Sequence, residues 1–130
     1  MIESPTRSGP WLTLAIAGAA ALCLAANTAP VSQAFGNTIV STYPDGRTAE
    51  LWLAQGGSYT AEGRKHDPSS GHWRVNGAKL CLSQIHPVPS PFSYCVAMPQ
   101  SGLSAGWDGK AFSGEAIRIH LAQGHVTGGG

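Results

Sequence analysis

Apolar and polar residues alternate with a period of two through most of this chain after its apolar N-terminal segment. Successive side chains of a β-strand point to opposite faces, so this pattern gives each strand one buried face and one exposed face. In residues 115–121, for example, Ile117 and Ile119 would point one way and Arg118 and His120 the other. Outside the N-terminal segment, no stretch shows the apolar periodicity of an amphipathic helix. The alternation therefore predicts an all-β fold.

Turn signals divide the alternating region into short strands. Asn76-Gly77 is the strongest hairpin signal, because a two-residue turn needs positive φ angles that Asn and Gly tolerate. The high counts of Gly, 17, and Pro, 9, also favour many tight turns over long helices. We expect strands at residues 37–43, 48–54, 58–63, 72–75, 78–83, 94–98 and 115–121, with loops at 64–71 and 84–93.

The expected architecture is an antiparallel meander of seven to eight short strands that closes into a small barrel. A two-layer β-sandwich is the alternative, since both arrangements remove or protect strand edges. In the hairpin around Asn76-Gly77, the alternation places Trp73, Val75, Leu80 and Leu82 on one core face. Cys81 then falls on the opposite face.

The N-terminal segment predicts export. Residues 11–26 form an uncharged, Ala-rich run of about sixteen residues after a weakly basic start, which is typical of a signal peptide. Ser32 and Ala34 are small residues at the two positions that a signal peptidase reads, so cleavage is expected after Ala34, with Ala29 as the weaker alternative. An uncleaved membrane anchor is the competing interpretation.

This processing predicts the domain organisation and the compartment. Residues 1–34 would be the signal peptide, residues 35–126 a single β-domain, and residues 127–130 a flexible C-terminal tail. The mature protein would be periplasmic or secreted. It would meet a membrane only if processing failed and the signal segment stayed as an anchor.

The cysteine count agrees with export. Cys23 leaves with the expected signal peptide, so Cys81 and Cys95 remain as an even pair in an oxidising compartment. We expect them to form one disulfide, whose loop of about fifteen residues makes it worth roughly 3 kcal/mol. A redox or metal pair is the alternative, but there is no Cys-x-x-Cys motif and no histidine at a short, regular offset.

Residues 71–82 read Gly-His-Trp-Arg-Val-Asn-Gly-Ala-Lys-Leu-Cys-Leu, and with Cys95 they resemble a pattern in small exported proteobacterial proteins of unknown function. The similarity spans residues 36–121. More distantly, a Gly-x-Trp strand start in a one-disulfide barrel resembles lipocalin-like or avidin-like binders and periplasmic metalloproteinase inhibitors. The first resemblance implies little about function, whereas the second implies a barrel that binds a ligand or a hydrolase. The short arm at residues 35–37 departs from the inhibitors.

Charge and motif content argue against several functions. A net charge of +1 with 12% charged residues gives no basic patch for nucleic acid. Asp45 and Asp108 are expected in turns, which leaves no carboxylate pair for glycoside chemistry, and no Gly-x-Ser-x-Gly elbow is present. We therefore expect a protein that is not an enzyme and needs no cofactor.

The histidines do not predict a metal site. Their spacings match no metal-ligand pattern, although imidazole is a common ligand and neighbouring strands could bring pairs of them together. The histidines are His66, His72, His86, His120 and His125.

Two features suggest a binding surface. Trp52 and Arg118 fall on the outward faces of their expected strands, with His120 beside Arg118, and an exposed Trp among polar residues can anchor a partner. Alternatively, Trp52 fills a barrel end or a second core. The loop with Pro87, Pro89 and Pro91 would be extended and clamped by the disulfide, either as a pre-organised contact or as a stiff connection.

Together these features predict a non-catalytic binding module. Its partner would be an unknown protein or a small apolar ligand. A proteinase or other hydrolase inhibitor is the alternative function, and a metal-binding scavenger is a further one.

Overall fold

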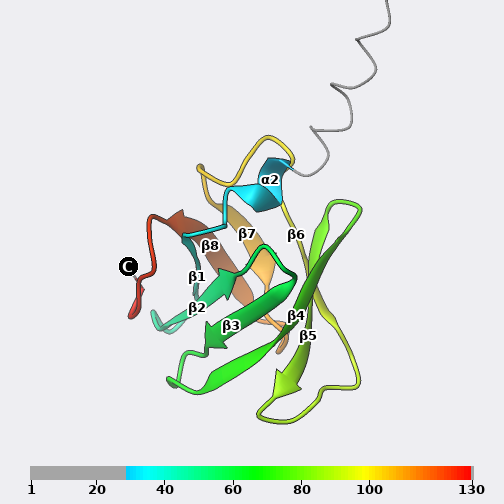
Figure 1. Cartoon of the computed structure of the whole chain (residues 1–130). Helices are drawn as coiled ribbons and strands as arrows, with labels where there is room; N and C mark the ends of the chain where they lie inside the picture. The colour runs from blue at the N-terminus through cyan, green and yellow to red at the C-terminus, as the bar shows by residue number, and fades with distance from the viewer. Residues whose placement is uncertain (1–28, 130) are drawn as a thin grey trace, which may run out of the picture.

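The computed structural model describes residues 29–129, which form a nearly closed barrel of eight antiparallel strands with one short helix at an end (Figure 1). This confirms the all-β fold and favours the barrel over the sandwich. The expected signal peptide lies outside the described residues except for residues 29–34. The elements are α2 (Ala29–Ser32), β1 (Thr38–Thr42), β2 (Thr48–Leu53), β3 (Ser58–Glu62), β4 (Pro68–Asn76), β5 (Lys79–His86), β6 (Tyr94–Ala97), β7 (Trp107–Lys110) and β8 (Ala116–Ala122).

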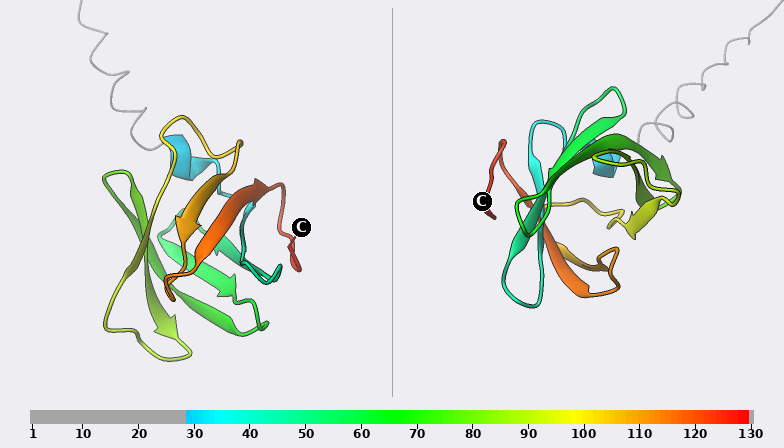
Figure 2. Two further views of the ribbon diagram at one scale, coloured as in Figure 1. Left: turned by 180° about the vertical axis from the view of Figure 1, so that it is seen from behind. Right: turned by 90° about the horizontal axis from the view of Figure 1, so that it is seen from below.

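The strands follow a meander whose two ends meet. The order in the sheet is β6-β5-β4-β3-β2-β1-β8-β7, so β1 pairs with β8 and the ladder is interrupted between β6 and β7. Side chains close this seam, because the Tyr94 hydroxyl on β6 donates to the Lys110 carbonyl on β7 at 2.6 Å. A Cβ at Gly109 would lie 3.0 Å from Val96 Cγ2. Glycine therefore lets β6 and β7 approach, and both views in Figure 2 show the curled sheet.

Three expectations about local structure were wrong. The loop expected at residues 84–93 begins later, because β5 extends to His86. Strand β7 was not predicted, since Asp108 and Gly109 were interpreted as turn residues, whereas Gly109 is needed for close packing inside the barrel. Residues 64–71 were expected to be a loop, but a tight turn joins Gly63 to Asp67 and β4 begins at Pro68. The polar composition of this strand reflects a barrel interior that is not filled with apolar side chains at that end.

The alternation in β8 is confirmed. Ile117 and Ile119 are buried in the core, while Arg118 is exposed on the outer face. The hairpin of β4 and β5 pairs Trp73 with Leu82 in the expected register. Val75 is exposed instead of buried, because it lies near the tip of this long hairpin. Leu80 is buried in the core.

The expected disulfide is also confirmed. Cys81 and Cys95 are directly opposite each other on β5 and β6, with an S–S distance of 2.05 Å. Cys95 is exposed and Cys81 is fully buried, although Cys81 alternates with the inward-facing Leu80 and Leu82. The bond fixes the edge strand β6 to its only hydrogen-bonded neighbour among the described strands.

The segment around α2 caps one end of the barrel. Val31 and Ala34 are 5% and 1% exposed and belong to the hydrophobic core. The Leu103 backbone N–H donates to Gln33 Oε1 at 2.6 Å, which ties the cap to the loop between β6 and β7. Figure 1 shows α2 beside this loop. The expected cleavage position after Ala34 lies within this packed segment, and the cleavage site itself stays a prediction.

Among residues 29–129, no helix has the length and apolar character that spanning a membrane requires.

Candidate functional site

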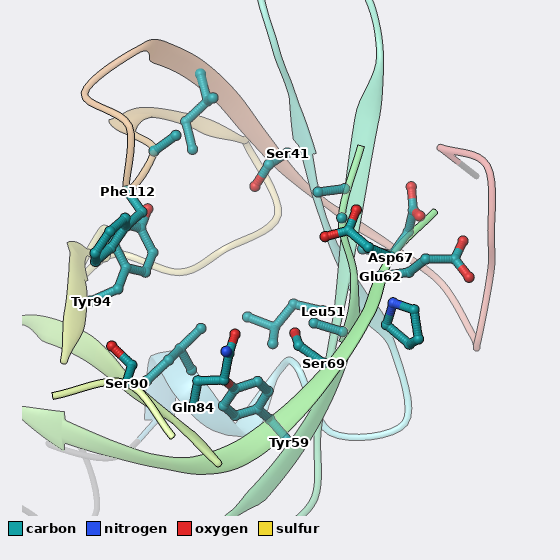
Figure 3. Close-up of a pocket in the computed structure, with 18 of the residues that line it drawn as sticks. Ser41, Leu51, Tyr59, Glu62, Asp67, Ser69, Gln84, Ser90, Tyr94 and Phe112 are labelled. Carbon is teal, nitrogen blue, oxygen red and sulfur yellow. The ribbon is translucent and has the colours of Figure 1, made fainter. Parts of the chain in front are cut away.

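The barrel is hollow at the end opposite α2, where a pocket of about 520 Å³ opens between the strands (Figure 3). Small residues occupy inward positions there: Ser41 faces Ala49 across β1 and β2, and Ala61 faces Ser69 across β3 and β4. Interiors of small barrels are normally filled by side chains, so a cluster of small residues leaves space. The pocket is therefore a consequence of residue size at one end of the sheet.

Apolar side chains form much of the wall, with Leu51, Leu82 and Ile117 contributed by three different strands. Tyr59 and Gln84 are the polar groups at the inner side. Both are in register with Gly71 on β4, one from β3 and the other from β5, so no side chain fills the space between them. Figure 3 shows both side chains at the pocket.

The polar side-chain atoms of Tyr59 and Gln84 lack some of their possible hydrogen-bond partners. Tyr59 is 5% exposed, and its hydroxyl has no hydrogen-bond partner among the described residues. Gln84 Nε2 donates to the Val88 carbonyl at 2.9 Å, which leaves the amide oxygen of Gln84 available within this part of the chain. Burial raises the pKa of Tyr59, so its hydroxyl stays protonated at neutral pH and can donate a hydrogen bond.

Aromatic residues surround the mouth of the pocket. Phe92 and Phe112 are 70% and 71% exposed, which is unusual for large apolar side chains. The Tyr94 and Phe112 rings meet edge to face with centroids 6.5 Å apart. Tyr43 completes the aromatic lining from the end of β1. The mouth thus offers apolar surface that a bound molecule would cover.

An ion-pair network lies beside the mouth. The Arg64 guanidinium stacks on the Tyr43 ring at 4.1 Å and bonds Glu115 Oε1 at 2.6 Å. It also lies 3.6 Å from Asp45 Oδ2. The hydrogen bond from Arg64 holds the pKa of the Glu115 carboxyl below its ordinary value. Arg64 is thus fully engaged by acidic neighbours.

The candidate surface predicted from the sequence does not form one site. Trp52 lies on the outer face of β2, where its indole stacks on the His125 ring at 4.2 Å and Nε1 donates to Thr38 Oγ1 at 2.9 Å. Thr38 Oγ1 in turn donates to the Gly124 carbonyl and accepts from the Val126 N–H. The C-terminal segment therefore covers Trp52.

The other predicted residues are dispersed as well. Arg118 forms an exposed ion pair with Asp108 at 3.2 Å, and His120 lies on β8 opposite Val40. Pro87 lines the pocket, whereas Pro89 and Pro91 are exposed and lie outside its lining. Pro87 is thus the only member of the predicted set that the structure brings to the pocket.

The described part of the chain contains no group of three or more His, Cys, Asp or Glu side chains arranged to hold a metal ion.

Tyr59, Gln84 and the mouth aromatics were missed by the sequence analysis. Their inward direction follows from the strand alternation, but the signal of a hollow is the coincidence of Ser41, Ala49, Ala61 and Ser69 at neighbouring inward positions. That coincidence depends on strand register, which single segments do not reveal.

The alkaline stability of the barrel is expected to depend on Tyr94. Burial, helped by the charge on Tyr43, raises the pKa of Tyr94 to about 12 from an ordinary value of 10.0. A raised pKa in the folded state means that the stabilisation is complete below pH 10.0 and is lost as the pH approaches about 12. The free energy of unfolding, measured by denaturant melts across this pH range, should fall more steeply with pH for the natural protein than for Tyr94→Phe. An equal pH dependence of the unfolding free energy in the two proteins would show that ionisation of Tyr94 does not destabilise the barrel.

No family model, curated protein or solved structure matches this chain. The barrel fold is thus shown by the structure alone, and the resemblance to a family of exported proteins stays a prediction.

Proposed function

We propose that this protein is an exported, non-catalytic binding module that holds a small apolar molecule in the hollow end of its barrel. The observation that carries the proposal is the pocket itself. Its volume of about 520 Å³ lies within the range of small-molecule sites, and most of its wall is aliphatic or aromatic. This use of the barrel interior would be lipocalin-like in manner.

Two further features support the proposal. The exposed Phe92 and Phe112 at the mouth would lose contact with water when a ligand binds, which is favourable for apolar surface. The Cys81–Cys95 disulfide supports an oxidising compartment, in agreement with export. A binding role requires no catalytic group in the pocket.

Filling the pocket should abolish binding. Ala61 faces the pocket and its neighbour Thr60 points outward and is exposed, so Ala61→Phe and Thr60→Phe add the same ring to opposite faces of β3. In fluorescence titrations with Nile red, an uncharged apolar dye, Ala61→Phe is expected to lower the affinity at least about tenfold, because the ring occupies the space of the ligand. Thr60→Phe should bind the dye as the natural protein does.

Thermal melts of both variants would show that they are folded. Failure of the natural protein to bind the dye, or equal binding by both variants, would contradict a ligand site inside the barrel.

A further inference from the structure

We propose that the pocket selects uncharged amphiphiles, whose hydrogen-bonding group meets Tyr59 and Gln84 at the inner side, and that it rejects amphiphiles with a carboxylate. This inference rests on the proposed function and adds the chemical class of the ligand. It is carried by the unpartnered Tyr59 hydroxyl, which is accessible from the pocket, and by the lack of a basic side chain among the described residues that line the pocket.

The inner side of the pocket is built to pair a small polar group. The Tyr59 side chain is almost completely buried, and its hydroxyl has no hydrogen-bond partner among the described residues. The hydroxyl oxygen itself is not one of the buried unpartnered atoms, so it stays accessible from the pocket and a bound polar group could reach it. The free amide oxygen of Gln84 lies on the same face, across Gly71. A neutral hydroxyl group of a ligand can accept from Tyr59 and donate to Gln84, which would satisfy both protein groups at once.

The position of this pair sets the orientation of the ligand. Leu51, Leu82 and Ile117 line the pocket around it, and the aromatic residues lie at the mouth. A ligand with its polar group at Tyr59 would place its apolar body between these walls and reach Tyr94 and Phe112 at the opening. Apolar surface would then be buried along the length of the molecule.

The charges around the pocket disfavour an anion. The described residues that line it include no Lys, Arg or His. Glu50 and Glu62 alternate with inward-facing neighbours and so lie on the outer faces of β2 and β3. The nearest cation in the ion-pair network, Arg64, is already bound to Glu115 and Asp45. A carboxylate moved into this pocket would lose its hydration and find no counter-charge, so its burial would be unfavourable.

Displacement of Nile red by compounds with matched ten-carbon chains tests the selectivity. At a pH near 8, below the aggregation concentrations of the compounds, n-decanol and methyl decanoate are expected to bind at least about tenfold more tightly than sodium decanoate. Methyl decanoate has the same acyl chain as decanoate and carries a methyl group in place of the negative charge. Binding of decanoate as tight as that of its methyl ester would overturn the inference.

The Tyr59→Phe variant tests the position of the polar group. It removes only an unpartnered hydroxyl, so n-decanol affinity is expected to fall about fivefold while the melting temperature changes little. Thr60→Val, which removes an exposed hydroxyl from the outer face of the same strand and lies outside the pocket lining, is the matched control and should leave n-decanol affinity within about twofold. An unchanged affinity in Tyr59→Phe would overturn the inference. Failure of the natural protein to bind Nile red would instead overturn the proposed function.

Discussion

A chain that begins at Phe35 is expected to be about 2–4 kcal/mol less stable than one that begins at Ala29. The truncation removes Val31 and Ala34 from the core, and it leaves the Leu103 backbone N–H without the Gln33 oxygen. Leu103 is itself fully buried, so the cap also shields a core residue from water. The conformational entropy of ordering the segment offsets part of these gains, which sets the net effect at a few kcal/mol.

Urea denaturation of the two chains would measure this difference, with Val31→Ala in the longer chain as a matched variant. That substitution removes buried methyl groups but keeps the Gln33 hydrogen bond, so it should lose only about 1–2 kcal/mol. Equal stability of the two chains would mean that residues 29–34 contribute nothing to the folded barrel. The intact mass of the exported protein would show whether processing after Ala34 removes the cap or whether cleavage at Ala29 keeps it.

Removal of the disulfide is the second change with a large expected effect. The Cys81→Ala/Cys95→Ala variant should lose about 2–4 kcal/mol in denaturant melts, since the bond closes a loop with a sequence separation of 14 residues. The bond also fixes β6, whose far side meets β7 only through side-chain contacts such as the Tyr94 hydrogen bond. Loosening β6 should therefore weaken the seam of the barrel as well.

The natural protein treated with a reductant provides the control, because it loses the bond without a change in side-chain size. It should lose a similar amount of stability. Thiol titration of the untreated, denatured protein should find no free thiol from Cys81 or Cys95. Two reactive thiols in protein from an oxidising compartment would contradict the structural role of the pair.

Local sequence was sufficient for most of the fold. The alternation of Ile117 and Ile119 with Arg118 predicted the inward and outward faces of β8, because strand geometry imposes a period of two regardless of the rest of the chain. The Asn76-Gly77 turn predicted its hairpin for the same local reason. The even cysteine count predicted the disulfide, since only Cys81 and Cys95 remain after the expected processing.

Local signals were misleading where tertiary packing set the residue type. Gly109 has the composition of a turn, but it lies in β7 because a Cβ there would come within 3.0 Å of Val96. Ser69 and its polar neighbours have the composition of a loop, but they pair with β3, and Ser69 faces a hollow interior. In both cases contacts with other strands of the barrel decided which residue was acceptable.

The sequence by itself determined most of the strands, most of their faces and the covalent cross-link, whereas only the tertiary structure decided where the barrel is hollow and which predicted surface residues stay uncovered. The pocket exists because register aligns small residues such as Ser41 and Ala49 on adjacent strands. Trp52 was an expected anchor, yet His125 covers it, and Thr38 binds Gly124 from the far end of the chain. Periodicity reports the direction of a side chain, but the neighbours it meets depend on contacts between residues distant in sequence.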